Sequence, residues 1–354
     1  QNPVLATVHV KSEKSVSLDT IGIKRLVDEN GTKKAYVKKR RAKAITKAVM
    51  HRMFGLQSEL NGDYRQAYMC NEYLFQNGTK ITSNYCAKKC CTVCNRIKGA
   101  QHLHKYGYRI LDLKDIYLVT LTDKNVGRGE LESNVDQMYK ALSRIKKNFY
   151  YHKMKIHGFR SFECTYSFEA GFNPHFHFIV QGKENAELLL RLWLAQFPNA
   201  SVKGQNIKKV GNTKKDLLEV FKYIAKPITK GYYSPAAYDE IMRTVKRHRT
   251  TEALGCIRGR LENDTDTISL NELEAQEITF KGNTVQLWQY VNELYDYVNF
   301  EGELLIDEPL DLKTLNAIEI INKSIIAENE KEQKLSNTEA FAKARSRIKE
   351  VEFF

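Results

Sequence analysis

Three segments in the middle of the chain have the residue pattern of β-strands: a β-rich run, a run that alternates apolar and polar residues, and an apolar run that contains two histidines. Residues 115–122 read DIYLVTLT, residues 158–168 read GFRSFECTYSF, and residues 172–182 read FNPHFHFIVQG. A period of two places successive side chains on opposite faces of a sheet, so each segment is predicted to be a strand. Only a short loop around Gly171 separates the second segment from the third, which predicts an antiparallel hairpin.

Other segments have the spacing of amphipathic helices. Apolar residues recur every three or four positions in residues 131–150, 186–197 and 214–227, and Pro227 ends the last of these helices. Further helices are expected near the C-terminus. One begins at Ser336 with a capping box, and an earlier one has an apolar face made of Leu312, Leu315, Ile318, Ile321 and Ile325. Packing on the core is their expected role; binding of a duplex partner and dimerisation are the alternatives.

A β-hairpin is predicted before the first of these strands. Asn77-Gly78 lies between two alternating runs, and this dipeptide favours a two-residue type I′ turn. Pairing about that turn places position 70 opposite position 85, so the cysteines that flank the hairpin are expected to meet at its open end.

The cysteines in this region have the spacing of a metal site. A tetrahedral all-thiolate zinc site is predicted from Cys70, Cys86, Cys91 and Cys94. His102 and His104 are competitors for the fourth position, and Cys90 is left over. A reduced cysteine-rich loop without metal is the alternative, whereas a disulfide scaffold is disfavoured because two of the cysteines are adjacent.

The charge balance of the chain indicates which class of partner it binds. The 354 residues include 56 Lys and Arg against 42 Asp and Glu, a formal net charge of +14. This excess favours nucleic acid as a partner. No apolar run approaches the roughly 18 residues that cross a bilayer, so a cytoplasmic protein with no membrane partner is expected.

Many of the cations are concentrated in one predicted helix. Residues 33–53 contain nine Lys or Arg together with apolar residues at helical spacing. The basic side is interpreted either as a solvated helix face or as an arm that contacts DNA phosphates. The candidate DNA contacts in it are Lys38, Lys39, Arg40 and Arg41.

Two histidines one residue apart suggest a second metal site. His175 and His177 point to the same face of their predicted strand. Neutral imidazole is a common metal ligand, and Glu163 on the neighbouring strand is a candidate anionic third ligand. The alternative is a pair of hydrogen-bonded histidines at a sheet edge.

The predicted helix over 214–227 carries the candidate reactive groups. Opposite its apolar face lie Glu219, Lys222, Tyr223 and Lys226. Tyr223 is the candidate nucleophile for a phosphodiester, Lys226 would hold a phosphate oxygen or lower the phenol's pKa, and Lys222 would contact DNA. Glu219 is the candidate general base for water. The alternative for each is a solvated helix face, and Tyr232 and Tyr233 are the next candidates for the nucleophile.

The motifs, taken in order, resemble those of the histidine-hydrophobic-histidine (HUH) endonucleases. NPHFHFIV carries the histidine pair, and together with YLVTLT before it and EVFKYIAK after it the order resembles that of rolling-circle replication initiators of bacterial plasmids. The resemblance covers about residues 70–260. It implies Mg²⁺ or Mn²⁺ at the histidines, nicking by a single tyrosine, and termination by the glutamate four residues before it. Asn173 and the additional Cys90 depart from the family pattern.

The expected fold is α+β, with a central antiparallel sheet and flanking helices in the ferredoxin-like or RRM-like arrangement that the resemblance implies. Residues 1–60 are expected to form a basic N-terminal region and residues 61–110 a zinc-binding, β-rich segment. Residues 111–260 would form the endonuclease core, and residues 261–354 a mostly helical region.

The expected function is nicking of single-stranded or extruded-hairpin origin DNA in the cytoplasm of a bacterial host. A 5′-phosphotyrosyl intermediate conserves the bond energy, and the sequence has no GxxxxGK[ST] phosphate loop. Unwinding and synthesis would therefore need a host helicase and polymerase, and a homo-oligomer is a further possible state. The alternatives are a transposase of the same superfamily and a non-catalytic zinc protein that binds nucleic acid.

Overall fold

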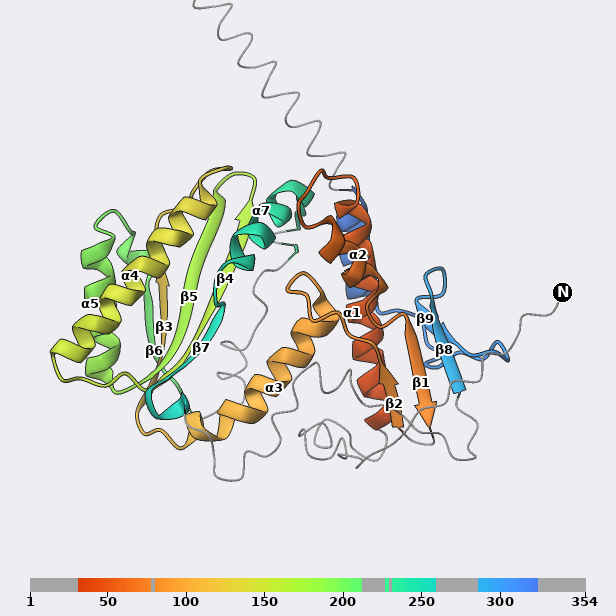
Figure 1. Cartoon of the computed structure of the whole chain (residues 1–354), viewed down its shortest axis with the longest axis horizontal. Coiled ribbons are helices and arrows are strands. Elements are labelled where there is room, and N and C mark those ends of the chain that lie inside the picture. The colour runs from red at the N-terminus through yellow and green to blue at the C-terminus, as the bar shows by residue number, and fades with distance from the viewer. Residues whose placement is uncertain (1–30, 78–79, 212–226, 229–230, 259–285, 324–354) are drawn as a thin grey trace, which may run out of the picture.

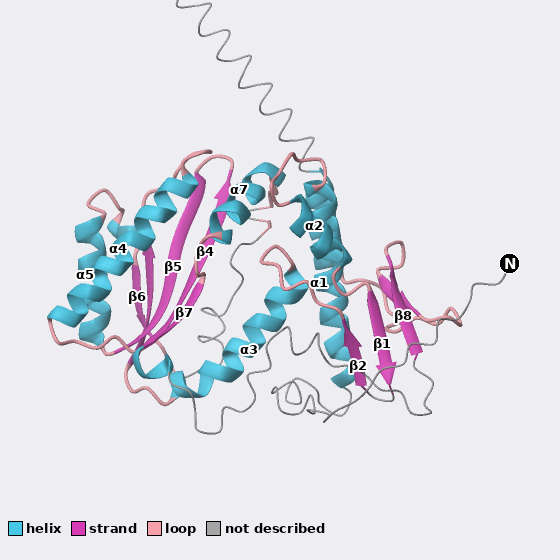
Figure 2. Cartoon of the chain, viewed as in Figure 1, coloured by secondary structure: helices cyan, strands magenta, loops and turns pink. Residues whose placement is uncertain are grey.

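The computed structural model describes residues 31–77, 80–211, 227–228, 231–258 and 286–323 of the chain (Figure 1). This part of the chain combines helices with antiparallel sheets, which confirms the predicted α+β class. It contains one sheet of five strands and one of four. Figure 2 shows the two sheets at opposite ends of the view.

The larger sheet has the strand order β6-β3-β5-β4-β7, and all neighbouring strands are antiparallel. Its strands are β3 (Ile116–Thr122), β4 (Gly158–Ser167), β5 (Gly171–Gln181), β6 (Asn206–Lys209) and β7 (Thr251–Leu254). The predicted hairpin is confirmed, because β4 and β5 pair along their whole length up to Ser167 opposite Gly171. Gly171 has φ of 75°, and a Cβ there would lie 2.4 Å from the Val126 carbonyl oxygen. The turn therefore requires glycine.

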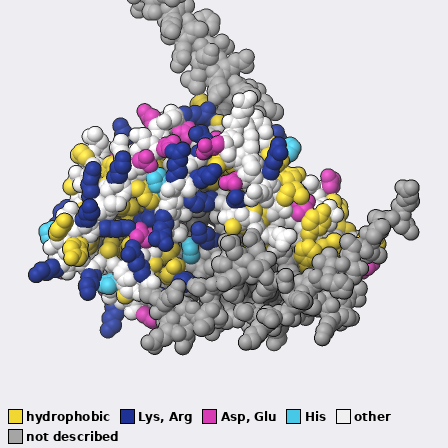
Figure 3. All heavy atoms as spheres, in the orientation of Figure 1, with side chains coloured by type: hydrophobic (Ala, Val, Ile, Leu, Met, Phe, Trp, Pro, Cys, Tyr) yellow, Lys and Arg dark blue, Asp and Glu magenta, His cyan; other side chains and the backbone are white. Residues whose placement is uncertain are grey.

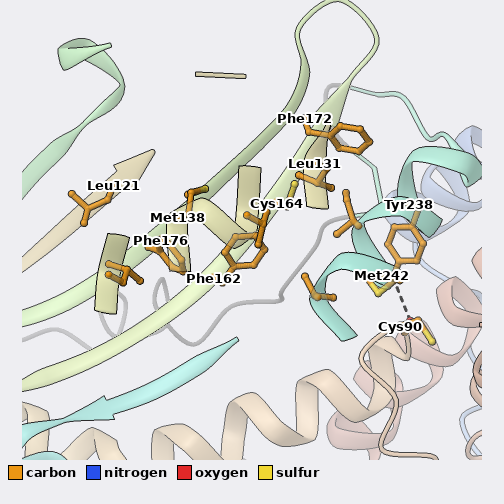
Figure 4. Close-up of a cluster of buried hydrophobic side chains, with 14 of the residues drawn as sticks. Cys90, Leu121, Leu131, Met138, Phe162, Cys164, Phe172, Phe176, Tyr238 and Met242 are labelled. Carbon is orange, nitrogen blue, oxygen red and sulfur yellow. Dashed lines mark hydrogen bonds between the residues drawn. The ribbon is translucent and has the colours of Figure 1, made fainter. Parts of the chain in front are cut away.

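One face of the larger sheet forms the main hydrophobic core. Phe162 on β4 and Phe176 on β5 pack with Met138, and Figure 4 shows these side chains close together. The helices on this face are α4 (Leu131–Tyr151), α5 (Lys183–Gln196) and α7 (Pro235–Lys246). The predicted helices over 131–150 and 186–197 are thus confirmed, whereas the predicted helix over 214–227 lies outside the described residues except for Pro227.

The opposite face of the larger sheet is only partly covered. The C-terminal half of α3 (Thr92–Leu111) packs there, with Ile110 against Phe159 and Ile179 in a second hydrophobic cluster. The short 3₁₀ helices are η3 (Val202–Gly204) and η4 (Gly255–Arg258), and α3 contacts the latter. Because α3 covers one end of this face, the polar side chains at the other end of β5 are not buried by it.

The smaller sheet joins segments from both ends of the described chain. Its order is β2-β1-β8-β9, built from β1 (Tyr73–Asn77), β2 (Lys80–Ser83), β8 (Gln286–Val291) and β9 (Asp296–Val298). Residues 286–291 and 296–298 lie in the region that was expected to be mostly helical, and they are strands. Leu74 faces Trp288 across the β1–β8 pair, and this contact buries both side chains.

The register of the predicted hairpin differs from the expected one. Asn77 pairs with Lys80 and Leu74 with Ser83, so the pairing encloses residues 78–79 and not Asn77-Gly78. Extending this register places position 70 opposite 87, two residues from the expected partner. An even shift keeps every side chain on its predicted face, and the cysteines still meet.

The basic helix forms, but several of its cations are buried. In α1 (Gly31–Met53), Arg40 pairs with Asp296 at 3.0 Å, and both side chains are only 2% exposed. Lys43, which is fully buried, and Lys47 both pair with Glu72, at 2.7 and 2.8 Å. Burial lowers the pKa of Lys43, and Glu72 opposes that shift. This side of α1 is thus neither a solvated face nor a DNA arm, and the burial of Arg40 is at odds with its predicted contact to DNA.

The other helices complete the packing around α1. The second helix, α2 (Asn61–Met69), and α3 both contact α1. Residues 312–323 form a helix whose Ile318 and Ile321 are buried against neighbouring clusters. Leu312 and Leu315 are 77% and 36% exposed, so the predicted apolar face is only partly correct, while the expected packing on the core is confirmed for this helix. Residue 325 and the helix expected from 336 lie outside the described residues.

We expect Asp296→Ala to lower the free energy of unfolding by about 3–5 kcal/mol, because it leaves the buried Arg40 guanidinium without its carboxylate. Arg41→Ala, which removes the more exposed ion pair with Asp311, should cost less than about 1 kcal/mol. Urea denaturation of both variants measures the difference. Equal losses would show that the buried pair has no special role.

Candidate metal centres and catalytic face

The β4–β5 register brings two histidines and a carboxylate together. Glu163 lies directly opposite His175, and His177 follows two residues along β5 on the same face. Glu163 Oε2 lies 3.3 Å from His177 Nε2 and 3.6 Å from His175 Nε2. The prediction that Glu163 lies beside the histidines is confirmed.

Hydrogen bonds hold both imidazoles with the same nitrogen directed at Glu163. His175 Nδ1 lies 3.0 Å from the carbonyl oxygen of Asn173, which can only accept, so Nδ1 carries the proton. His177 Nδ1 is 3.2 Å from the hydroxyl of Thr120 on β3. Each Nε2 therefore faces the carboxylate, and for His175 the tautomer leaves a lone pair there.

The three side chains fit a divalent cation. Their donor atoms lie within 4.8 Å of one another. The carboxylate side chain is 4% exposed and the imidazoles are 13% and 12% exposed, so the group is buried on the protein side and reachable from the other. Two imidazoles and one carboxylate are a common donor set for a metal that keeps positions open for substrate.

Four cysteines form a second group of candidate metal ligands. The sulfur atoms of Cys70, Cys86, Cys91 and Cys94 all lie within 4.8 Å of one another, with Cys94 Sγ at 3.5 Å from Cys70 Sγ and 3.7 Å from Cys86 Sγ. Hydrogen bonds with the thiols of Cys70, Cys86 and Cys91, and then burial, raise the pKa of Cys94. An all-cysteine set suits a structural Zn²⁺ ion, and the geometry supports the predicted ligand set.

The other candidates for this site point elsewhere. Cys90 is buried, with its sulfur 4.0 Å from the Asp63 carbonyl oxygen, and burial raises its pKa. The His102 ring packs against that of Phe159 in the larger sheet, with the ring centroids 5.6 Å apart. Burial, and then two nearby lysines, lower the pKa of His102 to about 4. Neither side chain belongs to the cysteine group, and nothing is described of the His104 side chain.

One helix connects the two groups. Cys91 caps the N-terminus of α3, its sulfur accepting from the Cys94 amide at 3.5 Å. The other end of α3 packs on the histidine-bearing face of the larger sheet. The cysteine group therefore anchors a helix that covers part of the face on which the histidines lie.

The candidate reactive residues are only partly placed. Glu219, Lys222, Tyr223 and Lys226 lie outside the described residues. Tyr233 is fully buried with its hydroxyl 3.2 Å from Met53 Sδ, and Tyr232 has its ring 6.5 Å from that of Tyr166. Tyr166 is three residues after Glu163 on β4, so its side chain lies on the opposite face of the sheet, the core side, away from the histidines.

The predicted DNA contacts on α1 have different surroundings. Lys38 is exposed, Lys39 Nζ donates to the Tyr85 hydroxyl at 2.6 Å, and Arg41 pairs with Asp311 at 2.7 Å. Lys38 has the most accessible cation of the three. Figure 3 shows many Lys and Arg side chains over the larger sheet and its helices as well, so the positive charge is distributed.

Two supporting residues were missed from the sequence. Thr120 and Asn173 orient the imidazoles, and Thr122 donates to the Asn173 side-chain oxygen at 3.1 Å. The sequence contained a pattern that could have identified Thr120, because Thr120 and Thr122 are polar positions on the same face of an otherwise apolar strand. Asn173 was noted only as a departure from the family pattern. Its backbone oxygen accepts from His175 and its side-chain oxygen accepts from Thr122.

The central region of the chain is similar to a known protein family. Residues 79–185 match a family model described as "Replication protein". The match covers less than a third of the chain but includes Glu163, both histidines and three of the four clustered cysteines. No curated protein and no solved structure matches the chain. No helix among the described residues is long and apolar enough to cross a membrane.

We expect purified protein to contain about one zinc ion per chain, held by the four cysteines. Cys94→Ser should lose that zinc and melt at a lower temperature, since a structural site contributes on the order of 10 kcal/mol. Cys90→Ala is the matched control and should retain the metal. Elemental analysis with thermal unfolding decides the matter: zinc retained by Cys94→Ser and lost from Cys90→Ala would refute the ligand set.

Binding of Mn²⁺ should require Glu163 and the histidines. Glu163→Gln and His177→Ala are each expected to weaken Mn²⁺ binding at least about 10-fold in calorimetric titration, because each removes one of three ligands. His152→Ala changes an exposed histidine at the end of α4 and should bind Mn²⁺ like the wild type. Unchanged affinity in the first two variants would mean that the group is a hydrogen-bonded cluster and not a metal site.

Proposed function

We propose that the protein initiates rolling-circle replication of a plasmid by nicking single-stranded or hairpin origin DNA. The observation that carries the proposal is the Glu163, His175 and His177 group on the open part of the larger sheet. The match of the surrounding residues to a replication protein family supports it. A non-catalytic zinc protein would give no reason for this second group of ligands.

The three side chains would hold a divalent ion, Mg²⁺ or Mn²⁺, that polarises the scissile phosphate. Asn173 and Thr120 keep the imidazoles in the orientation needed for this, because each fixes one Nδ1. The buried Glu163 supplies negative charge that draws a cation to this point of a strongly basic protein. Such a site can receive a phosphodiester from the exposed side.

Tyr223 is the proposed nucleophile. Its phenol oxygen would form a bond to phosphorus while the bond from phosphorus to the 3′ oxygen breaks, and the proton lost from the phenol balances the one gained by the leaving 3′-hydroxyl. Lys226 would hold a non-bridging phosphate oxygen, and Lys222 would contact a neighbouring phosphate. The positions of Tyr232 and Tyr233 on the core side of the sheet favour Tyr223 over either.

Glu219 is proposed to end the cycle. It precedes Tyr223 by one helical turn of sequence, and a carboxylate there can accept a proton from the water that cleaves the phosphotyrosyl bond. Neither nicking nor its reversal consumes a nucleotide, so a host helicase and polymerase are the proposed partners for unwinding and synthesis.

Tyr223→Phe should abolish both nicking and the covalent protein–DNA adduct, because it removes the attacking hydroxyl. The substrate is single-stranded DNA from the region that surrounds the coding gene, incubated with Mn²⁺ and analysed on a denaturing gel. Tyr232→Phe is the matched control and should nick normally. An adduct that survives in Tyr223→Phe, or that maps to another tyrosine by mass spectrometry, would refute the assignment.

In the same assay Glu219→Gln should still form the adduct but release it by water roughly 10²- to 10⁴-fold more slowly, as expected for loss of a general base. The time course of adduct and free nicked DNA measures this rate. If Glu219→Gln loses nicking as completely as Tyr223→Phe, the residue has a structural or metal-binding role and does not act in termination.

A further inference from the structure

Two cations converge beside the metal group without a carboxylate between them. Lys98 lies on α3, and Arg249 lies in the turn between α7 and β7. Within the described ranges, neither side chain forms an ion pair with an acidic residue, although the chain has many such pairs elsewhere. Cations that are left facing one another, with no carboxylate between them, suit an anionic ligand from solution.

The register of the larger sheet locates Arg249. Thr251 pairs with Ser161, and the Phe162 amide donates to the Thr250 carbonyl oxygen at 2.8 Å. Continuing this pairing by one more residue brings position 249 level with Glu163 on the neighbouring strand. Because adjacent strands lie roughly 5 Å apart, this continuation would bring the backbone of Arg249 beside the metal group.

The packing of α3 locates Lys98 on the same face. His102 of α3 packs against Phe159 of β4, and Arg109 donates to the Ile257 carbonyl oxygen at 3.1 Å. The helix thus crosses the sheet with Arg109 near η4 and His102 near β4. The preceding turn of α3 points towards Arg249. Lys98 lies one turn before His102 on the same side of the helix. Burial, and then the charge of Arg249, lower the pKa of Lys98, which agrees with this proximity.

The turn that carries Arg249 is held from the cysteine segment. Lys89 Nζ donates to the carbonyl oxygens of Val245 and His248 at 2.5 and 3.0 Å, at the C-terminal end of α7. The Arg249 carbonyl oxygen accepts from the Tyr139 hydroxyl and from Arg160, each at 3.0 Å. The backbone at 249 is thus fixed from both sides, while its side chain is exposed.

We propose that Lys98 and Arg249 form a binding site for the phosphate backbone of single-stranded DNA, which directs the strand past the N-terminal half of α3 towards the metal group. Two cations on separate elements match successive phosphates of a flexible strand better than a single point of attachment does. Lys89 acts as a positioning residue that fixes the turn beneath Arg249. The inference rests on the proposed function for its substrate class, but it concerns binding and not the chemical step.

The test measures the salt dependence of binding to a fluorescent 20-nucleotide oligothymidine without divalent ions, so that no nicking intervenes. Each phosphate contact contributes a slope of about −0.7 to log K against log salt for single strands. The Lys98→Ala, Arg249→Ala double variant should therefore have a slope shallower by about 1.4. Arg249→Lys keeps the charge and should retain most of the wild-type slope.

The matched control is the double variant Lys140→Ala, Lys147→Ala. It removes two exposed cations of α4, which covers the opposite face of the sheet, and so changes the net charge equally. Its slope should equal that of the wild type. Equal changes in both double variants would overturn the proposal in favour of a general charge effect, as would an unchanged slope for Lys98→Ala, Arg249→Ala or failure of the wild type to bind.

A second measurement uses the wild-type protein, so it does not depend on the folding of any variant. Acetylation of lysines, followed by mass spectrometry, should show Lys98 protected by the oligonucleotide while Lys140 reacts equally with and without it. Equal reactivity of Lys98 in both conditions would overturn the site. These results are distinct from those on Tyr223: loss of the cation site leaves the nucleophile assignment intact, and an error in the nucleophile leaves the binding slopes unchanged.

Discussion

The pairing of β4 with β5 is the constraint on which the rest of the histidine-bearing face depends. A shift by one residue would turn His175, His177 or Glu163 into the hydrophobic core and bring phenylalanines to the open face. The aromatic packing of Phe162 and Phe176 against α4 resists such a shift. The apolar face thus fixes the register, and the register in turn sets the distances between the polar ligands on the other face.

The cations of this chain fall into two groups, those that are buried in ion pairs and those that are exposed to solvent. On α1, Arg40, Lys43 and Lys47 are withdrawn from solvent and neutralised by Asp296 and Glu72, so that they hold the smaller sheet to the helix. Buried pairs of this kind are weak sources of stability but make one arrangement of segments unique. The net charge of the chain includes these buried cations. It is therefore larger than the charge that the surface presents to a polyanion.

The sequence predicted three of the five strands of the larger sheet, β3, β4 and β5, because their β-rich pattern is local; the short strands β6 and β7 were not predicted. It also placed Glu163 beside the histidines and selected the four cysteines, since strand period and thiol spacing are local properties. The β1–β8 pair joins residues more than two hundred positions apart, and no local pattern marks such a partner. The burial of Arg40 follows from that pairing, so it was missed for the same reason, and Thr120 was missed because its role depends on the ring that faces it.

The two tryptophans of the chain are divided between the two sheets. Trp193 is fully buried on α5, and its indole nitrogen donates to the Thr122 carbonyl oxygen at 2.9 Å, at the end of β3 that lies opposite His175. Trp288 lies on β8 and packs with Leu74 and Tyr297 in the smaller sheet. Each sheet is therefore associated with one tryptophan, and the tryptophan emission of the protein is the sum of one signal from the histidine-bearing half and one from the half that α1 holds in place.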